Sequence, residues 1–173
     1  MDFMTRRSIR KYKEQKIEKN KIDELIKAAL VAPTGRNSHS TKFLVIDDVE
    51  SIKFLSNVRE HGSAFAKDAP LIIAVLGEKS KSTTLSSDCS IAAFAIQMEA
   101  HELGLGSCWV HIENRTAAGG KSSEELIRER FNIPEDYMIM CMIAIGYPDE
   151  IKPAHKLTQE DYKRVYFNSY KEN

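Results

Sequence analysis

The chain has 173 residues, of which 42% are hydrophobic and 29% charged, a balance typical of a globular domain that excludes bulk disorder. Lysine plus arginine number 25 and so do aspartate plus glutamate, so no net charge attracts nucleic acid or an anionic membrane surface. We therefore expect a single domain over residues 1–173 that holds any anion locally.

The cysteines and the N-terminal sequence favour the cytoplasm. The chain has an odd number of cysteines, namely Cys89, Cys108 and Cys141. They form no C-x-x-C pair and lie in apolar runs, which is typical of reduced, buried thiols. No apolar block of a signal peptide follows the basic N-terminus, and no apolar run is long enough to cross a membrane. We expect a cytoplasmic protein that neither is exported nor spans a membrane.

The hydrophobic pattern predicts alternating helices and strands. Apolar residues at helical spacing predict a helix over residues 18–31, which Pro33 and Gly35 end. Short apolar runs predict strands at residues 43–46, 71–76, 108–110 and 137–145. A capping pattern with Glu125 predicts a helix over residues 122–131. This alternation predicts an α/β or α+β protein with one sheet.

The longest helical candidate, residues 87–104, is apolar around most of its circumference. A helix of this kind is buried on both sides. The second covering surface is either the rest of the same domain or another subunit, and four alanines allow a second helix to approach closely. We expect a homodimer, with a helix wrapped by its own domain as the alternative.

A basic N-terminal segment is the first candidate for chemistry. On an extended backbone Arg6, Ser8 and Arg10 share one face, where two guanidinium groups and a hydroxyl can bind a phosphate or a carboxylate. The alternative is a solvated basic arm, because charge runs commonly face water.

Two further segments carry features of a binding site. Residues 32–39 follow a helix and combine proline and glycine with polar side chains, a composition that suits the edge of a planar heterocycle or a plain connecting loop. Residues 104–112 place two glycines before a strand with the only tryptophan, Trp109. Free backbone N–H groups of that strand can face a ligand, although Trp109 also fits a core position.

Two other kinds of site match poorly. Gly120-Lys121-Ser122 precedes a helix as a phosphate-binding loop does, but the full pattern requires glycine where Arg115 stands. A zinc site built from Cys89, His101, Cys108 and His111 lacks a second paired ligand spacing. We therefore expect no metal.

Five segments within residues 6–156 form an ordered set: Arg-Arg-Ser-Ile-Arg-Lys-Tyr, Ala-Pro-Thr-Gly-Arg-Asn-Ser, Asp-Ala-Pro-Leu-Ile-Ile, Glu-Leu-Gly-Leu-Gly-Ser-Cys-Trp-Val and Ile-Gly-Tyr-Pro. The sequences of these segments and their order along the chain resemble those of the flavin-dependent nitroreductase family. The resemblance implies an α+β fold with a central mixed β-sheet flanked by helices. It also implies an intertwined homodimer with two FMN molecules at the interface, and two-electron reduction that uses NADH or NADPH.

The resemblance assigns roles to two groups of residues. It implies that Arg6 and Ser8 contact the FMN phosphate and ribityl chain, that Arg7 contributes mainly through its backbone, and that Arg10 lies near the pyrimidine end of the flavin. It implies that the opposing subunit contacts the flavin through Pro33, Thr34, Asn37 and His39.

The C-terminal half adds further residues by the same resemblance. The strand around Trp109 matches a segment whose backbone N–H groups meet flavin N5 and O4, which indicates His111 and Ile112. Lys156 matches a basic residue that closes on the phosphate. Glycine or glutamate is commoner in the family where His111 stands, so no substrate preference is implied. Residues 113–121 are a candidate lid, with two glycines as its hinge.

The implied reaction passes hydride from a nicotinamide to flavin N5 and then two electrons to a nitroaromatic, quinone or similar acceptor, in a ping-pong mechanism. Because N5 carries the chemistry, no catalytic side chain is required, and a positive charge such as Arg10 is the main tuning element. The alternative is a non-catalytic module that binds or stores flavin.

Overall fold

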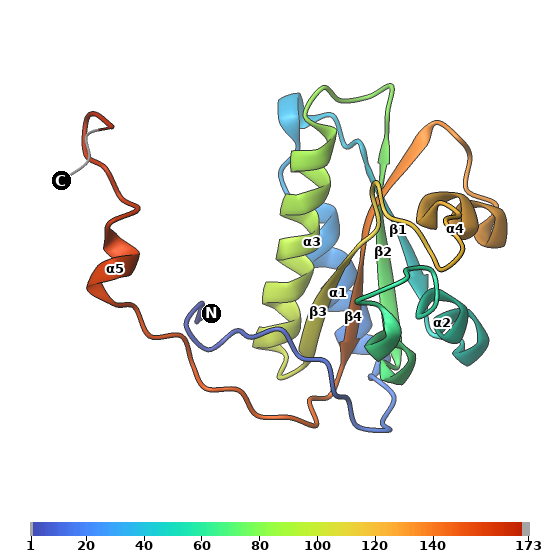
Figure 1. The fold of residues 1–173 in the computed structure, drawn as a ribbon, viewed down its shortest axis with the longest axis horizontal. Helices are drawn as coiled ribbons and strands as arrows, with labels where there is room; N and C mark the ends of the chain where they lie inside the picture. The colour runs from blue at the N-terminus through green and yellow to red at the C-terminus, as the bar shows by residue number, and fades with distance from the viewer. Residues whose placement is uncertain (1, 171–173) are drawn as a thin grey trace.

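The computed structural model describes residues 2–170 and places one four-stranded sheet between two layers of helices (Figure 1). The strands are β1 (Thr41–Ile46), β2 (Leu71–Glu78), β3 (Gly106–His111) and β4 (Tyr137–Gly146). The helices are α1 (Lys19–Val31), α2 (Val49–Leu55), α3 (Leu85–Glu102), α4 (Ser123–Phe131) and α5 (Gln159–Tyr162), with short 3-10 turns η1 (Gly35–Asn37) and η2 (Ala64–Asp68). The α+β class is confirmed.

The strand order is β1-β2-β4-β3, and every neighbouring pair is antiparallel. This corrects the expected mixed sheet, since the only parallel pairing among residues 2–170 is the single bridge between Ser8 and Ser107. The physical reason lies in the connections. β2 and β3 run in the same direction and are joined through α3, as a parallel pair is, but β4 is inserted between them.

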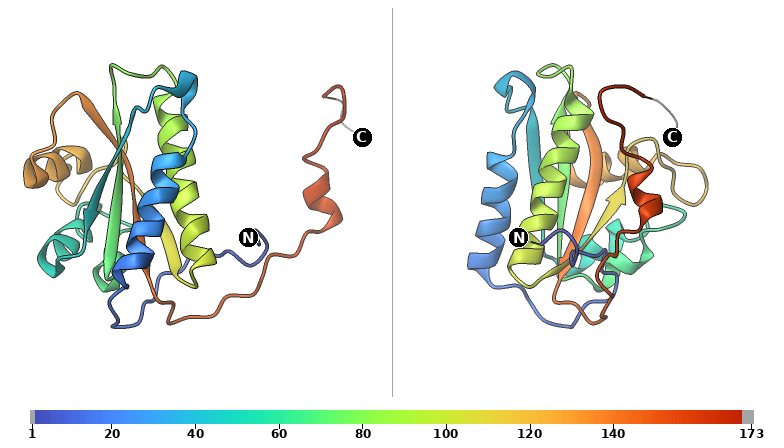
Figure 2. Two further views of the ribbon diagram at one scale, coloured as in Figure 1. Left: turned by 180° about the vertical axis from the view of Figure 1, so that it is seen from behind. Right: turned by 90° about the vertical axis from the view of Figure 1, so that its left-hand side faces the viewer.

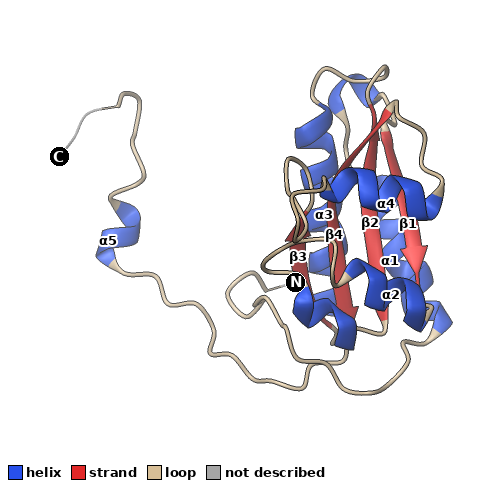
Figure 3. Ribbon diagram, turned by 45° about the vertical axis from the view of Figure 1, so that its right-hand side comes forward, coloured by secondary structure: helices blue, strands red, loops and turns tan. Residues whose placement is uncertain are grey.

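Both faces of the sheet are covered, as Figures 2 and 3 show: α1 and α3 lie on one face, and α2 and α4 on the other. Alternate residues of β2 therefore enter different cores. Ile73 packs in the cluster that contains Leu25 of α1 and Ile96 of α3, whereas Ile72 packs in the cluster of Ile127 from α4. Burial on both faces explains why the strands were recognisable as continuous apolar runs.

Helix α3 retains an exposed apolar strip in the single chain. Ile91 and Phe94 are each 44% exposed, although most of the helix is buried against α1 and the sheet. Phe3 stacks on Phe94 with 6.2 Å between ring centroids. The described chain therefore does not wrap this helix completely.

Residues 148–170 form a tail that runs away from the sheet and carries α5 (Figure 1). Several of its apolar side chains are exposed, among them Ile151, Leu157, Tyr162, Phe167 and Tyr170. Within residues 2–170, no helix combines the length and the apolar character needed to cross a bilayer.

Candidate functional site

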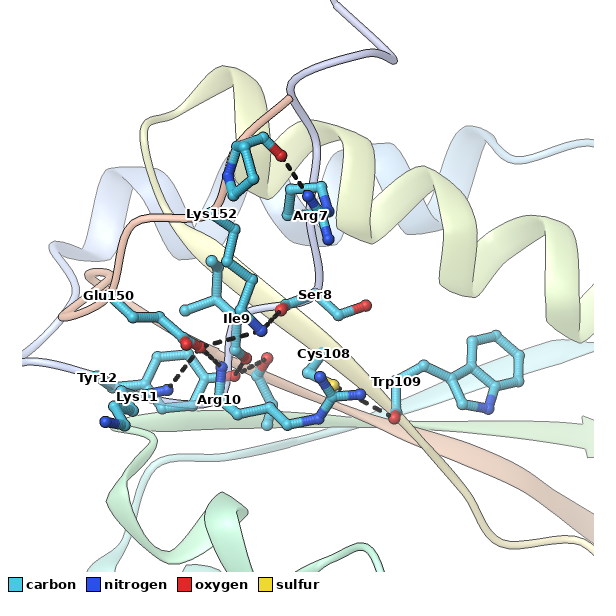
Figure 4. A network of polar contacts seen from close by, with 12 residues as sticks. Arg7, Ser8, Ile9, Arg10, Lys11, Tyr12, Cys108, Trp109, Glu150 and Lys152 are labelled. Carbon is cyan, nitrogen blue, oxygen red and sulfur yellow. Dashed lines mark hydrogen bonds and ion pairs between the residues drawn. The ribbon is translucent and has the colours of Figure 1, made fainter. Parts of the chain in front are cut away.

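An N-terminal arm, residues 5–12, lies along the free edge of β3 (Figure 4). The N–H of Ile9 donates to the carbonyl of Ser107 at 3.0 Å. A side chain at Gly106 would bring Cβ within 2.8 Å of Ile9, so the close approach requires glycine. The buried Tyr12 hydroxyl donates to the Ile9 carbonyl at 2.6 Å and fixes the inner side of the arm.

The alternate side chains of the arm, together with Lys152, act on the thiol of Cys108. Burial raises the pKa of Cys108, while Arg10, the hydroxyl of Ser8, Lys152 and Arg6 act in the opposite direction. Lys152 Nζ also donates to the Ser8 carbonyl at 2.7 Å. The structure therefore brings three cations and a hydroxyl to one place, as the alternation of an extended arm predicts.

Glu150 fixes the backbone of the arm. Its Oε1 accepts from the N–H of Arg10 at 2.5 Å and from the N–H of Lys11 at 3.3 Å, and it lies 3.5 Å from Lys152 Nζ. The Arg10 N–H is the main cause that lowers the pKa of Glu150. The Arg10 guanidinium forms no ion pair within residues 2–170 and lies 5.7 Å from the centroid of the Phe65 ring. That guanidinium remains available to an anion.

The tail is fastened to the same arm. Arg7 donates to the carbonyl of Pro153, and the N–H of His155 donates to the carbonyl of Met4 at 2.7 Å. A hollow of about 280 Å³ opens beside these contacts, lined by residues that include Arg6, Arg7, His101, Ser107 and Lys152. Lys156 is exposed in the tail and is not brought to this cluster, whereas Lys152, which sequence reasoning missed, is.

The hydrogen-bond phase of β3 decides which of its amides are open. Ile112 donates its N–H to the carbonyl of Met140 at 3.0 Å. Because the amides of an antiparallel strand alternate in direction, those of Trp109 and His111 point away from β4. The carbonyl of Ser107 belongs to the same outward series and accepts the arm. The amide expected at Ile112 is thus paired inside the sheet, and its side chain is fully buried.

Trp109 and His111 form a short aromatic stack on the half-exposed side of β3. Their ring centroids are 6.2 Å apart, with 15° between the ring planes. Trp109 also packs against the core beneath α1 and α3, so its core role is observed, while its contact with a ligand stays a prediction. Burial, followed by the charge of Arg115, lowers the pKa of His111, which keeps this ring neutral at neutral pH.

The second predicted segment is a strained loop held by Asp88. Arg36, Asn37 and His39 have φ angles of 54°, 54° and 47°, a region that non-glycine residues rarely adopt. Asp88, only 2% exposed, lies in the first turn of α3 and accepts from the N–H of Gly35 at 2.9 Å. Its carboxylate also accepts from the hydroxyls of Ser40, Ser82 and Thr84.

We expect Asp88→Ala to lower the free energy of unfolding by about 2–3 kcal/mol, because it leaves buried donors without an acceptor. Asp88→Asn keeps one acceptor for the Gly35 N–H and is expected to cost about 1 kcal/mol. Burial raises the pKa of Asp88, but the four hydrogen bonds hold it below its ordinary value of 3.8. The stabilisation is therefore present above that value and is lost as the pH falls below it.

Urea denaturation of the wild type and both variants measures these differences. At neutral pH the wild type is expected to be the most stable of the three proteins, followed by Asp88→Asn and then Asp88→Ala. The difference in free energy of unfolding between the wild type and Asp88→Ala is expected to become smaller in strong acid. Equal stability of the three proteins would contradict the assigned role of Asp88.

The two halves of the predicted site lie at opposite ends of α3 in one chain. The loop that carries Pro33, Thr34, Asn37 and His39 is bound near Asp88, whereas the arm reaches His101 in the last turn, where Thr5 Oγ1 lies 2.9 Å from Nε2. Thirteen residues of helix separate these points by roughly 20 Å. The buried Ser38 Oγ in the same loop has no hydrogen-bond partner within residues 2–170.

Comparison with known proteins identifies the family to which the chain belongs. Residues 3–61 and 54–147 match the family model described as the Nitroreductase family, and the chain belongs to that family. A protein of Methanothermobacter thermautotrophicus, provisionally named NADH dehydrogenase/NAD(P)H nitroreductase, is 35% identical over 163 residues, which are 91% of this chain and 81% of the relative.

Solved structures agree with the sequence relatives. A structure described as an FMN-dependent nitroreductase from Clostridium difficile R20291 is 44% identical, with a TM-score of 0.93 and coverage of 96% of this chain and 97% of that one. Among the sequence relatives, an iodotyrosine deiodinase of Thermotoga neapolitana is 26% identical over 175 residues, which are 87% of this chain and 88% of the relative.

Proposed function

We propose that this protein is an FMN-dependent oxidoreductase that takes hydride from NADH or NADPH and passes two electrons to a nitroaromatic, quinone or similar acceptor in ping-pong order. The observation that carries the proposal is the combination, along one strand edge, of a cationic cluster and two open amides. Relatives named as an NAD(P)H nitroreductase and as an FMN-dependent nitroreductase support it.

The donor set fits an FMN molecule. Arg6, Ser8 and Lys152 would hold the phosphate, Arg10 would lie near the pyrimidine end of the flavin, and the outward amides of Trp109 and His111 would meet acceptor atoms of the flavin ring. The acid nearest this cluster, Glu150, is directed to backbone N–H groups and to Lys152, so the cluster keeps a positive balance that suits a phosphate dianion. Bound FMN supplies the hydride chemistry, because its ring accepts and donates electron pairs.

The side chains of this site orient and stabilise. The Arg10 guanidinium, which lacks an ion pair within residues 2–170, can stabilise negative charge that develops beside it. The neutral ring of His111 and the half-buried Trp109 cover the strand next to the open amides and restrict the access of water. No proton transfer by a side chain is required.

We also propose that the protein is a homodimer, because one chain separates the two halves of its site. A second copy that packs its α3 antiparallel against the first places the His39 loop of one subunit beside the arm of the other. The exposed strip of Ile91 and Phe94 and the apolar tail supply surface for this contact. A cytoplasmic location is supported by three free, buried cysteines.

The purified protein is expected to be yellow, to contain about one FMN per chain and to run at about twice 19.6 kDa. Under anaerobic conditions NADH or NADPH should bleach the flavin, and a nitroaromatic or quinone should restore the colour. A flavin that never bleaches indicates the storage module instead. A colourless monomer that refuses added FMN contradicts the proposal.

A further inference from the structure

Two loops are held side by side beyond the end of β3. The N–H of Glu60 donates to the carbonyl of Thr116 at 3.0 Å. The buried Ser123 hydroxyl donates to the carbonyl of Val58 at 2.6 Å, and the N–H of Ser123 donates to the carbonyl of Arg115 at 2.8 Å. These contacts bring the segment around Arg59 next to the segment around Arg115.

The turn that carries Arg115 is compact. A bridge joins Thr116 to Ser122, and the N–H of Ala117 donates to the carbonyl of Lys121 at 2.9 Å. The two glycines expected to act as a lid hinge lie in the tip of this turn, with φ angles of 88° and 82°. The turn thus holds Arg115 at a fixed place, and the N–H of Arg115 donates to the carbonyl of Ile112 at 3.1 Å.

Arg59 and Arg115 lie in two neighbouring loops, their charges act on each other, and neither has a counter-ion within residues 2–170. Arg59 is half-buried and Arg115 exposed, yet within residues 2–170 neither guanidinium has an acid at ion-pair distance or donates a hydrogen bond. Burial, followed by the charge of Arg115, lowers the pKa of Arg59. After burial, both arginines also act on His111 at the end of β3.

The nearby acids do not neutralise the pair. Glu60 pairs with His61 at 3.8 Å, and the carboxylate of Glu124 accepts from the N–H of Ile139 at 3.0 Å. The charge of Glu113 acts on His111, but Glu113 makes no ion pair with Arg115. Like charges in two loops joined by backbone hydrogen bonds repel each other, and an anionic ligand that contacts both relieves this repulsion.

We propose that Arg59 and Arg115 bind an anionic group, a phosphate or a carboxylate, of the molecule that exchanges electrons at the β3 edge. The inference rests on the proposed function, and it adds a second anion site distinct from the cluster at the arm. Four residues of extended strand, from Ser107 to His111, separate the two sites by roughly 13 Å. Planar, bidentate guanidinium groups suit both phosphate and carboxylate.

Two sources can supply this anion: a phosphate of the nicotinamide dinucleotide, or a carboxylate of the electron acceptor. Calorimetric titration of the oxidised FMN-loaded protein, without a reductant, separates them. The probes are NAD+ and NADP+ on one side, and para-nitrobenzoate with its uncharged analogue para-nitrobenzamide on the other. The variants are Arg59→Ala, Arg115→Ala and the double variant.

The control variant is Lys121→Ala, which removes one positive charge from the same turn but breaks only the pair with the exposed Glu129. We expect the double variant to weaken binding of the anionic probe about 10- to 100-fold, less than the full loss of two charge-assisted hydrogen bonds because Arg115 is exposed and its charge is screened by solvent. Binding of para-nitrobenzamide and the FMN content should stay unchanged. Lys121→Ala is expected to match the wild type.

Each outcome has a clear reading. Weaker binding of the dinucleotides alone assigns the site to the nicotinamide phosphates, and weaker binding of para-nitrobenzoate alone assigns it to the acceptor. Unchanged affinity for all probes overturns the inference, as does an equal loss in Lys121→Ala. If the double variant does not fold, Arg59→Gln and Arg115→Gln are tested singly. If the wild type binds no FMN, the proposed function fails, and the same titrations on the flavin-free protein then test the arginine pair.

Discussion

The double variant Arg6→Ala, Arg10→Ala is expected to bind FMN about 100- to 10,000-fold more weakly than the wild type. Each lost charge-assisted hydrogen bond to FMN removes about 1.5–3 kcal/mol of binding free energy, and two are lost here, one to the phosphate and one to the flavin ring. Both guanidinium groups act on the thiol of Cys108 from the same side of the arm. Titration of FMN fluorescence with flavin-free protein measures the dissociation constant.

Lys11→Ala is the matched control for this experiment. Lys11 is exposed on the same arm, and its only hydrogen bond to Glu150 uses the backbone N–H, which the substitution preserves. We expect its affinity for FMN to stay within about threefold of the wild type, as for a screened surface charge. If Lys11→Ala weakens binding as strongly as the double variant, the arm attracts FMN only through its general charge, and the contacts assigned to Arg6 and Arg10 are wrong.

The second large effect is expected from Phe94→Glu on the exposed strip of α3. A glutamate there places an unpaired charge in each half of the proposed dimer interface, and the substitution occurs twice in each dimer. With at least about 2 kcal/mol for each central position, the dimer dissociation constant should rise about 1,000-fold or more. Light scattering over a dilution series should show the mass of one chain, and the FMN content should fall with it.

Val49→Glu provides the comparison for that substitution. Val49 is 76% exposed in the first turn of α2, on the opposite face of the sheet, where a negative charge near a helix N-terminus is tolerated. This variant is expected to remain a dimer and to keep its FMN. A Phe94→Glu protein that remains a fully loaded dimer at low concentration would show that α3 is not the interface.

The sequence predicted those parts of the fold whose signal is local. The helix expected at 18–31 occurs at Lys19–Val31, and the helix expected at 122–131 begins after Ser122, whose side chain accepts from the N–H of Glu125. Helix α2 was missed because seven residues carry little periodicity. The antiparallel sheet was missed because strand order depends on the insertion of β4, which no local pattern encodes.

For the site too, only the features that depend on local sequence could be predicted. The alternation of Arg6, Ser8 and Arg10 follows from an extended backbone, so their common side could be anticipated. Lys152 and Glu150 could not, because they reach the arm from more than a hundred residues away. The expectation at Ile112 depended on which amides of β3 face outward, and only the register with β4 settles that phase.

The loop at residues 34–39 shows a different limit. In a sequence, glycine is the usual indication of a left-handed backbone conformation, but here Arg36, Asn37 and His39 adopt it. The hydrogen bonds that hold the loop converge on Asp88, which lies about fifty residues further along the chain and reads in sequence as a first-turn helix residue. The one local signal for Asp88 is that it follows several serines and threonines, whose hydroxyls are able to donate to its carboxylate.

The fastening of the tail to the arm has a consequence for biosynthesis. The contacts of Arg10 with Glu150, Ser8 with Lys152 and Arg7 with Pro153 span 140, 144 and 146 positions of the chain. Contacts of such long range close late in folding, since the entropy of the intervening loop opposes them until the sheet is complete. A nascent polypeptide on the ribosome therefore cannot assemble this anchorage until β4 and the first residues after it have emerged.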